Sequence, residues 1–178
     1  TFNAGVAISG TGTLDGGAGA IVVSGELALS GGTLRAPGSG LSVSGNWTRT
    51  GGTFNQRTGT VTLTGAGAST VSGNTTFYNL TCATGGKVVN FTSGTTQTVQ
   101  KTLNLTGAVG SLIQLRSTSP GVKWSLSVTG GMQTVLYVDV QDSDALTNTI
   151  TVDEGVDNGN NNANWLFGTT NRYWVLGT

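Results

Sequence analysis

The chain has 178 residues, no net formal charge and no histidine. Without histidine there is no Ser-His-Asp triad, no histidine-ligated zinc and no imidazole base, so we expect a protein that is not an enzyme. Thirty glycines, 9% charged and 36% hydrophobic residues favour short strands joined by turns over disorder, which combines few apolar residues with high net charge. The basic residues form no run that would neutralise a row of phosphates, so nucleic acid is not an expected partner.

Residues 25–64 consist of one twenty-residue unit that occurs twice. The motif Gly-Gly-Thr and a closing pair of apolar residues recur at the same offsets in both copies, and residues 5–24 match them as a looser first copy. A fixed period of about twenty residues is typical of stacked repeat architectures. We therefore predict an all-β fold, a parallel β-helix (β-solenoid) with one repeat unit in each coil.

Stacking the three copies predicts columns of equivalent residues. Thr13, Thr33 and Thr53 are expected to point outward, because each precedes an apolar position. The next outward positions break the flat, methyl-rich surface that an ice-binding protein needs, so ice binding is a distant third function.

Arg49 replaces an apolar residue of the copy before, and we expect this run to bend or Arg49 to reach a terminal opening. Three columns are uniformly apolar and form the predicted core: Leu14, Leu34 and Phe54; Ile21, Leu41 and Val61; and Val23, Val43 and Leu63.

From Gly65 onward the period lengthens to about 25 to 28 residues, so we predict coils that widen toward the C-terminus. The only cysteine, Cys82, alternates with Leu80 and is expected to point inward as a small apolar residue. No helix is predicted, and no stretch is long and apolar enough to span a bilayer. We expect residues 1–119 to form solenoid coils, residues 120–167 to form final coils or a β-rich acidic cap, and residues 168–178 to form a C-terminal tail or strand.

Most of the acidic residues lie in one C-terminal stretch. Carboxylates and amide oxygens in irregular loops suit calcium, which accepts six to eight oxygen ligands, although the spacing matches no EF-hand. A solvated acidic loop is the alternative interpretation. Calcium is the one cofactor for which the sequence offers candidate ligands: Asp139, Asp142, Asp144, Asp153, Asp157 and Asn158.

Aromatic residues gather near the C-terminus. Trp165 and Phe167 share a strand face and are expected to close the end of the core, because a bare final coil exposes an edge and apolar surface. Tyr173, Trp174 and Val175 read as a further strand that could contact a neighbouring copy. An open first coil and an acidic, aromatic end together suggest head-to-tail assembly.

Several segments resemble the repeat regions of secreted or surface-displayed bacterial β-helix proteins, the filamentous-haemagglutinin-like and adhesin-type exoproteins. The resemblance implies a bacterial protein outside the cell or on its surface, with a structural or adhesive role, and no catalytic residues. Its expected partners are other copies of the chain or a cell or matrix surface. A carbohydrate-binding or carbohydrate-cleaving β-helix is the alternative function. The segments that carry the resemblance are Ser44–Thr48, Gly51–Phe54, Thr60–Gly65, Phe77–Thr81, Tyr137–Asp144 and Asn164–Phe167.

Overall fold

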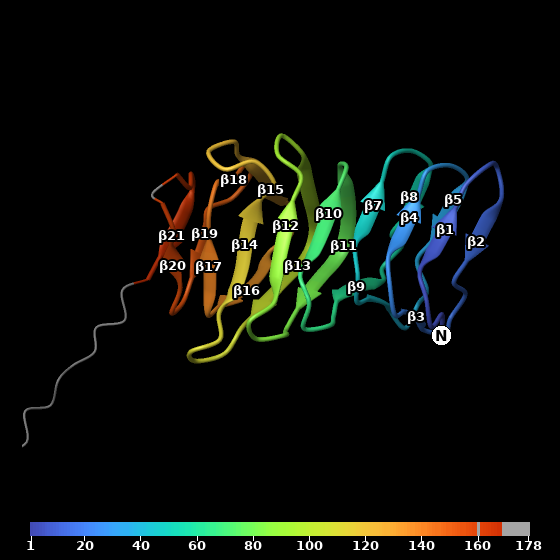
Figure 1. The fold of residues 1–178 in the computed structure, drawn as a ribbon, viewed down its shortest axis with the longest axis horizontal. Helices are drawn as coiled ribbons and strands as arrows, with labels where there is room; N and C mark the ends of the chain where they lie inside the picture. Colours follow the sequence, from blue (N-terminus) through green and yellow to red (C-terminus); the bar gives the residue numbers. More distant parts are fainter. Residues whose placement is uncertain (160, 169–178) are drawn as a thin grey trace, which may run out of the picture.

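The structure is a computed structural model that describes residues 1–159 and 161–168. Within these ranges the chain forms 21 β-strands, and every pair of strands that the sheets contain is parallel. The strands stack along the long axis, with the N-terminus at one end and β21 (Trp165–Phe167) near the other (Figure 1). The predicted fold class, an all-β parallel β-helix, is confirmed. The described residues contain no helix long and apolar enough to cross a membrane.

One face of the solenoid is an eight-stranded sheet that runs the length of the molecule. Each coil contributes one strand to it, and successive members are separated in sequence by two short strands or by one long strand, β11 or β13. In order they are β1 (Val6–Ile8), β4 (Leu27–Leu29), β7 (Trp47–Arg49), β10 (Ser69–Ser72), β12 (Val88–Phe91), β14 (Ile113–Ser117), β17 (Val138–Val140) and β20 (Val156–Asp157).

The other faces are formed by the strands between these. A three-stranded sheet holds β2 (Thr13–Asp15), β5 (Thr33–Arg35) and β8 (Thr53–Asn55). A two-stranded sheet pairs β19 (Ile150–Val152) with β21. The remaining sheet contains β3 (Ile21–Val23), β6 (Leu41–Val43), β9 (Thr60–Leu63), β11 (Thr75–Cys82), β13 (Thr96–Thr106), β15 (Trp124–Val128), β18 (Ser143–Ala145) and, paired with β13, β16 (Met132–Leu136).

The two long strands, β11 and β13, each serve two faces. Their pairing shifts register between Phe77 and Asn79, so each strand has two halves. The first half of β13 pairs with β15 and the second half with β16. The corner that separates two short strands in the first three coils is therefore replaced by an irregularity within one continuous strand.

The columns predicted from the repeat are present in the structure. Leu14 pairs with Leu34, and Leu34 pairs with Phe54. Ile21, Leu41 and Val61 form the second column, and Val23, Val43 and Leu63 the third. Their inward side chains belong to one hydrophobic core, which continues through every later coil to Ile150 and Val152. Cys82 lies in this core fully buried, as its alternation predicts.

The number of residues in each coil changes along the chain, and the sequence period predicts only part of this change. Equivalent residues are 20 apart at Thr13 and Thr33, and 30 apart at Thr102 and Met132. The coils then shorten again, to 19 residues between Trp124 and Ser143 and 15 between Ile150 and Trp165. The widening predicted toward the C-terminus is thus a widening of the central coils. The strands of residues 120–167 remain in sheets with those of the preceding coils.

Arg49 takes neither of the positions expected for it. The run does not bend away, since Arg49 pairs in register with Leu29, and the residue lies in the third coil rather than at an opening. Its guanidinium donates hydrogen bonds to the backbone carbonyls of Asn74 at 2.6 Å and Gly52 at 3.0 Å. Carbonyl oxygens at the corner of the coil thus receive the charge that would be costly to bury alone.

Candidate functional site

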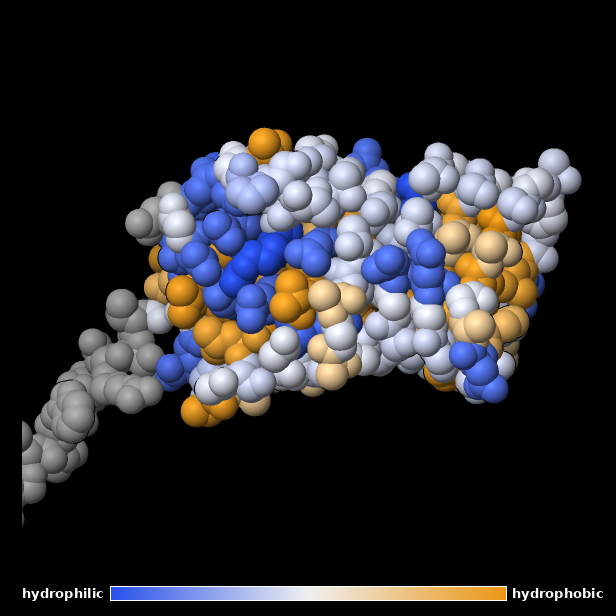
Figure 2. All heavy atoms as spheres, in the orientation of Figure 1, coloured by the Kyte–Doolittle hydropathy of each residue, from blue (hydrophilic) through white to orange (hydrophobic). Residues whose placement is uncertain are grey.

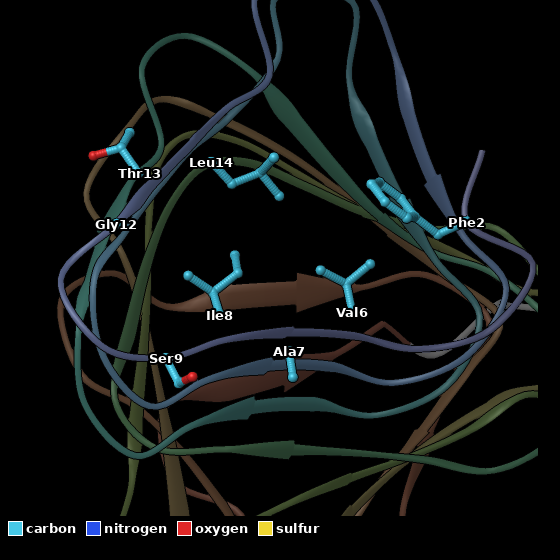
Figure 3. Close-up of a pocket in the computed structure, with 8 residues that line it drawn as sticks. All are labelled: Phe2, Val6, Ala7, Ile8, Ser9, Gly12, Thr13 and Leu14. Atoms are coloured by element: carbon cyan, nitrogen blue, oxygen red, sulfur yellow. The ribbon is translucent and has the colours of Figure 1, made fainter.

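The N-terminal end of the solenoid is an open mouth in the apolar core. A cavity of about 340 Å³ lies there, lined by residues of β1, of β2 and of the chain before and between them. The side chains of Phe2, Val6, Ile8 and Leu14 point into it, whereas Ala7, Ser9 and Thr13 point away (Figure 3). Phe2 is 41% exposed, although it belongs to the lining of a hydrophobic cavity. The mouth can therefore bind an apolar group, and the described side chains that line it include no carboxylate or amine.

The surface around the mouth is also apolar. Figure 2 shows hydrophobic residues gathered over the N-terminal coils, and a hydrophilic band farther along, over β12, β14 and β17. Asp15 is the only charged side chain from Phe2 to Val23, and it points outward on β2. It pairs with Arg35 at 3.3 Å and with Arg57 at 2.8 Å. The Gly17 backbone amide, followed by the Arg57 hydrogen bond, lowers the pKa of Asp15 to about 2.

The strands beneath the hydrophilic band carry an ion pair between neighbouring coils, from Arg116 on β14 to Asp139 on β17. The guanidinium of Arg116 donates to both carboxylate oxygens of Asp139, at 3.0 and 2.6 Å, and also to the backbone carbonyl of Asp139 at 2.8 Å. Both side chains are largely buried, at 17% and 16% exposed. Asn158, from the next coil, donates to Asp139 as well. This arrangement is a bidentate contact that ties three coils together.

The other acidic residues predicted as calcium ligands have separate partners. Asp142 is buried and accepts hydrogen bonds from the Gly121 amide at 2.9 Å and the Asn161 side chain at 2.7 Å. Asp144 accepts one from Asn164, and Asp157 one from Asn162. The backbone carbonyl of Asp153 accepts a hydrogen bond from the amide of Tyr137.

These contacts give most of the six predicted calcium ligands separate hydrogen-bond partners. Of the six predicted ligands, only Asp139 and Asn158 are joined directly to each other. Among the described residues, no three acidic, cysteine or histidine side chains are grouped closely enough to hold a metal ion. Calcium binding stays a prediction. Equal Tm values in calcium and in chelator would exclude it.

The asparagine-rich segment after β20 acts as a polar end to the solenoid. Asn162 donates to the carbonyl of Val140 at 2.8 Å and accepts from the amide of Ser143 at 2.9 Å, so its side chain replaces strand pairing on that coil. Trp165 and Phe167 pack against the core with ring centroids 6.5 Å apart, as predicted. Trp165 also donates to the Ser143 hydroxyl. The predicted assembly residues Tyr173, Trp174 and Val175 lie outside the described residues.

A buried lysine is the feature that sequence reasoning missed. Lys87 is fully buried, and its Nζ donates to the carbonyls of Gly65 at 3.1 Å and Gly67 at 3.0 Å. Burial lowers the pKa of Lys87 and raises that of the neighbouring Cys82 thiol. The sequence carries a weak signal for it, since Lys87 directly precedes the alternating strand β12 (Val88–Phe91). The amine holds the loop of the preceding coil in place.

Comparison with known proteins adds no family to this description, because no family model, no curated protein and no solved structure matches the chain.

Proposed function

We propose that the chain is a structural or adhesive scaffold outside the cell or at the cell surface, where a rigid, extended solenoid supplies shape, resistance to proteolysis and contact surfaces. The observation that carries the proposal is the uninterrupted apolar core, which runs from Ile8 to Val152 beneath sheets with few irregular segments. Buried, hydrogen-bonded strands are poor protease substrates because cleavage requires local unfolding. The long side faces of the solenoid are then available for contact with a surface.

The alternative, a carbohydrate-binding or carbohydrate-cleaving protein, predicts a groove with exposed aromatic rings and acidic residues. Phe2 is the only aromatic residue among the large hydrophobic side chains that are exposed in the described part of the chain. It lies at the end of the core rather than along a face, and the cavity beside it has no carboxylate in its lining. These observations support the scaffold over the carbohydrate function.

Two measurements on the purified chain separate these functions. A scaffold is expected to survive a nonspecific protease at concentrations that digest an unfolded control, and to show no signal on a glycan array or in a reducing-sugar assay. Binding to a defined glycan, or release of reducing ends, would instead establish the carbohydrate function. Rapid digestion throughout the coils would contradict the scaffold itself.

We also propose that the scaffold associates end to end with other copies, because open ends of parallel sheets pair readily. Each coil pairs with the next through parallel strands, and the outer strands of the first coil have backbone groups of the same kind. Electron microscopy and light scattering test this association. Filaments would indicate contacts at both ends of the molecule, and discrete small oligomers contacts at one end.

A further inference from the structure

We propose that Asn158 is a site of spontaneous modification, where the side-chain amide is converted to a carboxylate through a cyclic imide formed with the backbone of Gly159. Asn158 is the only asparagine of the sequence that is followed by glycine. The reaction requires the next backbone nitrogen to reach the side-chain carbonyl carbon, and a residue without a Cβ hinders this approach least. This modification is independent of the scaffold function proposed above.

The chemistry needs only the chain itself and water. The backbone nitrogen of Gly159 attacks Cγ of Asn158, so that a C–N bond closes the imide and the Cγ–Nδ2 bond breaks. The Gly159 nitrogen loses its proton to water, and the departing amine takes up a proton and leaves as ammonia. Water then adds to one of the two imide carbonyls and opens the ring. The product is aspartate, or isoaspartate in which the main chain runs through the side-chain carboxyl group.

The backbone on the two sides of Asn158 is held very differently. The amide of Asn158 donates to the carbonyl of Val140 at 2.9 Å, which fixes the chain up to this residue. Gly159 is exposed in the turn that follows, with a φ of 81°. Among the residues that the structure describes, its amide donates to no backbone carbonyl. The attacking nitrogen is therefore reachable without the loss of a strand pair.

Asn162, in the same segment, has the opposite arrangement. Its side chain donates to the carbonyl of Val140 at 2.8 Å and accepts from the amide of Ser143 at 2.9 Å. The amide of the next residue, Ala163, donates to the carbonyl of Ser143 at 2.9 Å. An imide at Asn162 would require all three hydrogen bonds to break first. The structure therefore protects Asn162 and leaves Asn158 reactive.

The conversion changes a contact that joins three coils. Nδ2 of Asn158 donates to Oδ2 of Asp139 at 3.3 Å, and the guanidinium of Arg116 donates to the same oxygen at 2.6 Å. A carboxylate in place of the amide removes one donor and brings two like charges together. Isoaspartate also lengthens the main chain directly after β20. The modified chain is therefore expected to have a weaker contact between β17 and β20.

The experiment is incubation of the folded 178-residue chain at mildly alkaline pH, followed by peptide mapping with mass spectrometry that separates asparagine, aspartate and isoaspartate at each position. In Gly159→Ala the attacking residue gains a Cβ, whose nearest neighbour would be Gln141 at 3.6 Å. We expect conversion at Asn158 in the parent chain, and conversion about tenfold slower in Gly159→Ala because the Cβ crowds ring closure.

The matched control is Ala163→Gly, which places glycine after Asn162 and keeps the amide that pairs with Ser143. We expect Asn162 of this variant to stay intact in the folded chain and to convert in urea. Conversion of Asn162 in the folded variant as fast as that of Asn158 would overturn the proposal. An Asn158 that stays intact in the folded parent and converts only in urea would overturn it as well.

Circular dichroism checks that each variant is folded. If the left-handed backbone at residue 159 prevents Gly159→Ala from folding, Asn158→Gln replaces it, since the longer side chain closes a larger ring more slowly. Loss of the amide at residue 158 at the parental rate in the folded replacement variant would contradict the imide route.

The effect of the product on stability is measured with a second pair of variants. Asn158→Ala removes the hydrogen-bond donor to Asp139, and Asn158→Asp also adds the negative charge. We expect Asn158→Asp to have the lower Tm, by a difference that shrinks at high salt because screening weakens the repulsion. Equal Tm values for the two variants would contradict the expected weakening of the contact between β17 and β20 by charge.

Discussion

At the scale of single residues, Lys87 shows how one buried charge can be accommodated in an apolar solenoid. Its amine is fully buried against two carbonyls, and burial lowers its pKa below the ordinary 10.5. The unfolded chain therefore binds more protons than the folded chain just below pH 10.5. Stability is expected to rise with pH through this window, and the gain is complete above 10.5.

The variant that tests this titration is Lys87→Met, compared with the parent chain by urea unfolding at several values between pH 7 and 10.5. All proteins in the comparison, including the control below, carry Cys82→Ala, which removes the neighbouring thiol. We expect the parent to gain more stability with pH than the variant does. Lys101→Met, at an exposed position on β13, serves as the control and should retain the parental slope. Equal slopes for all three proteins would show that Lys87 is not responsible.

Asp15 is the opposite case, because its pKa shift changes the stability of the protein at acidic pH. Its pKa is lowered to about 2 from an ordinary 3.8. The stabilisation that accompanies this shift is present above pH 3.8 and is lost as the pH falls toward 2. The effect is expected to be small because the group is exposed. Thermal unfolding at pH 5, 3 and 2 should show a shallower acid loss for Asp15→Asn than for the parent. An unchanged acid limb would show that the arginine contacts do not persist in solution.

At the scale of elements, the corners decide how closely two coils can approach. Gly73 follows β10 with a φ of 78°, and a Cβ added there would overlap the carbonyl oxygen of Arg49 in the coil below. Gly94 follows β12 with a similar φ of 72° and has open space where its Cβ would lie. Both positions favour glycine through their backbone conformation. Only Gly73 is also required by the stacking of coils.

Alanine at each position separates the two effects. Gly94→Ala is expected to cost about 1 kcal/mol, the ordinary penalty of a left-handed alanine. Gly73→Ala should cost clearly more, because a rigid backbone carbonyl must move as well. Chemical denaturation of the two variants and the parent gives the comparison. If the two substitutions lower the free energy of unfolding equally, the backbone at Gly73 adjusts to a Cβ, and the close approach of the two coils does not require glycine there.

The elements also show what the sequence could and could not predict. The strict repeat predicted the pairing of the first three coils residue by residue, because Leu14, Leu34 and Phe54 fall at one offset and a slip by one residue would expose them. The positions of Arg49 and Lys87 were not predictable, since each depends on carbonyls of another coil. The shortening of the last coils was also missed. Side chains such as Asn162 replace backbone pairing there, and the spacing of hydrophobic residues does not predict such contacts.

At the scale of the whole molecule, stability should vary along the axis. A solenoid is held together chiefly by contacts between adjacent coils, so a terminal coil has one neighbour where a central coil has two. In the 178-residue chain, the first coil is expected to be the least protected, because β1 and β2 each pair with one strand and its core residues line the open mouth. The last described coil has Trp165, Phe167 and the asparagine contacts to cover it. Fraying is therefore expected to begin at the N-terminus.

Amide hydrogen exchange measures this gradient directly. At low protein concentration, the amides of β12 and β14 are expected to exchange near the rate set by global unfolding, and those of β1 and β2 orders of magnitude faster. Uniform exchange along the chain would contradict both the gradient and the coil-by-coil account of stability on which it rests.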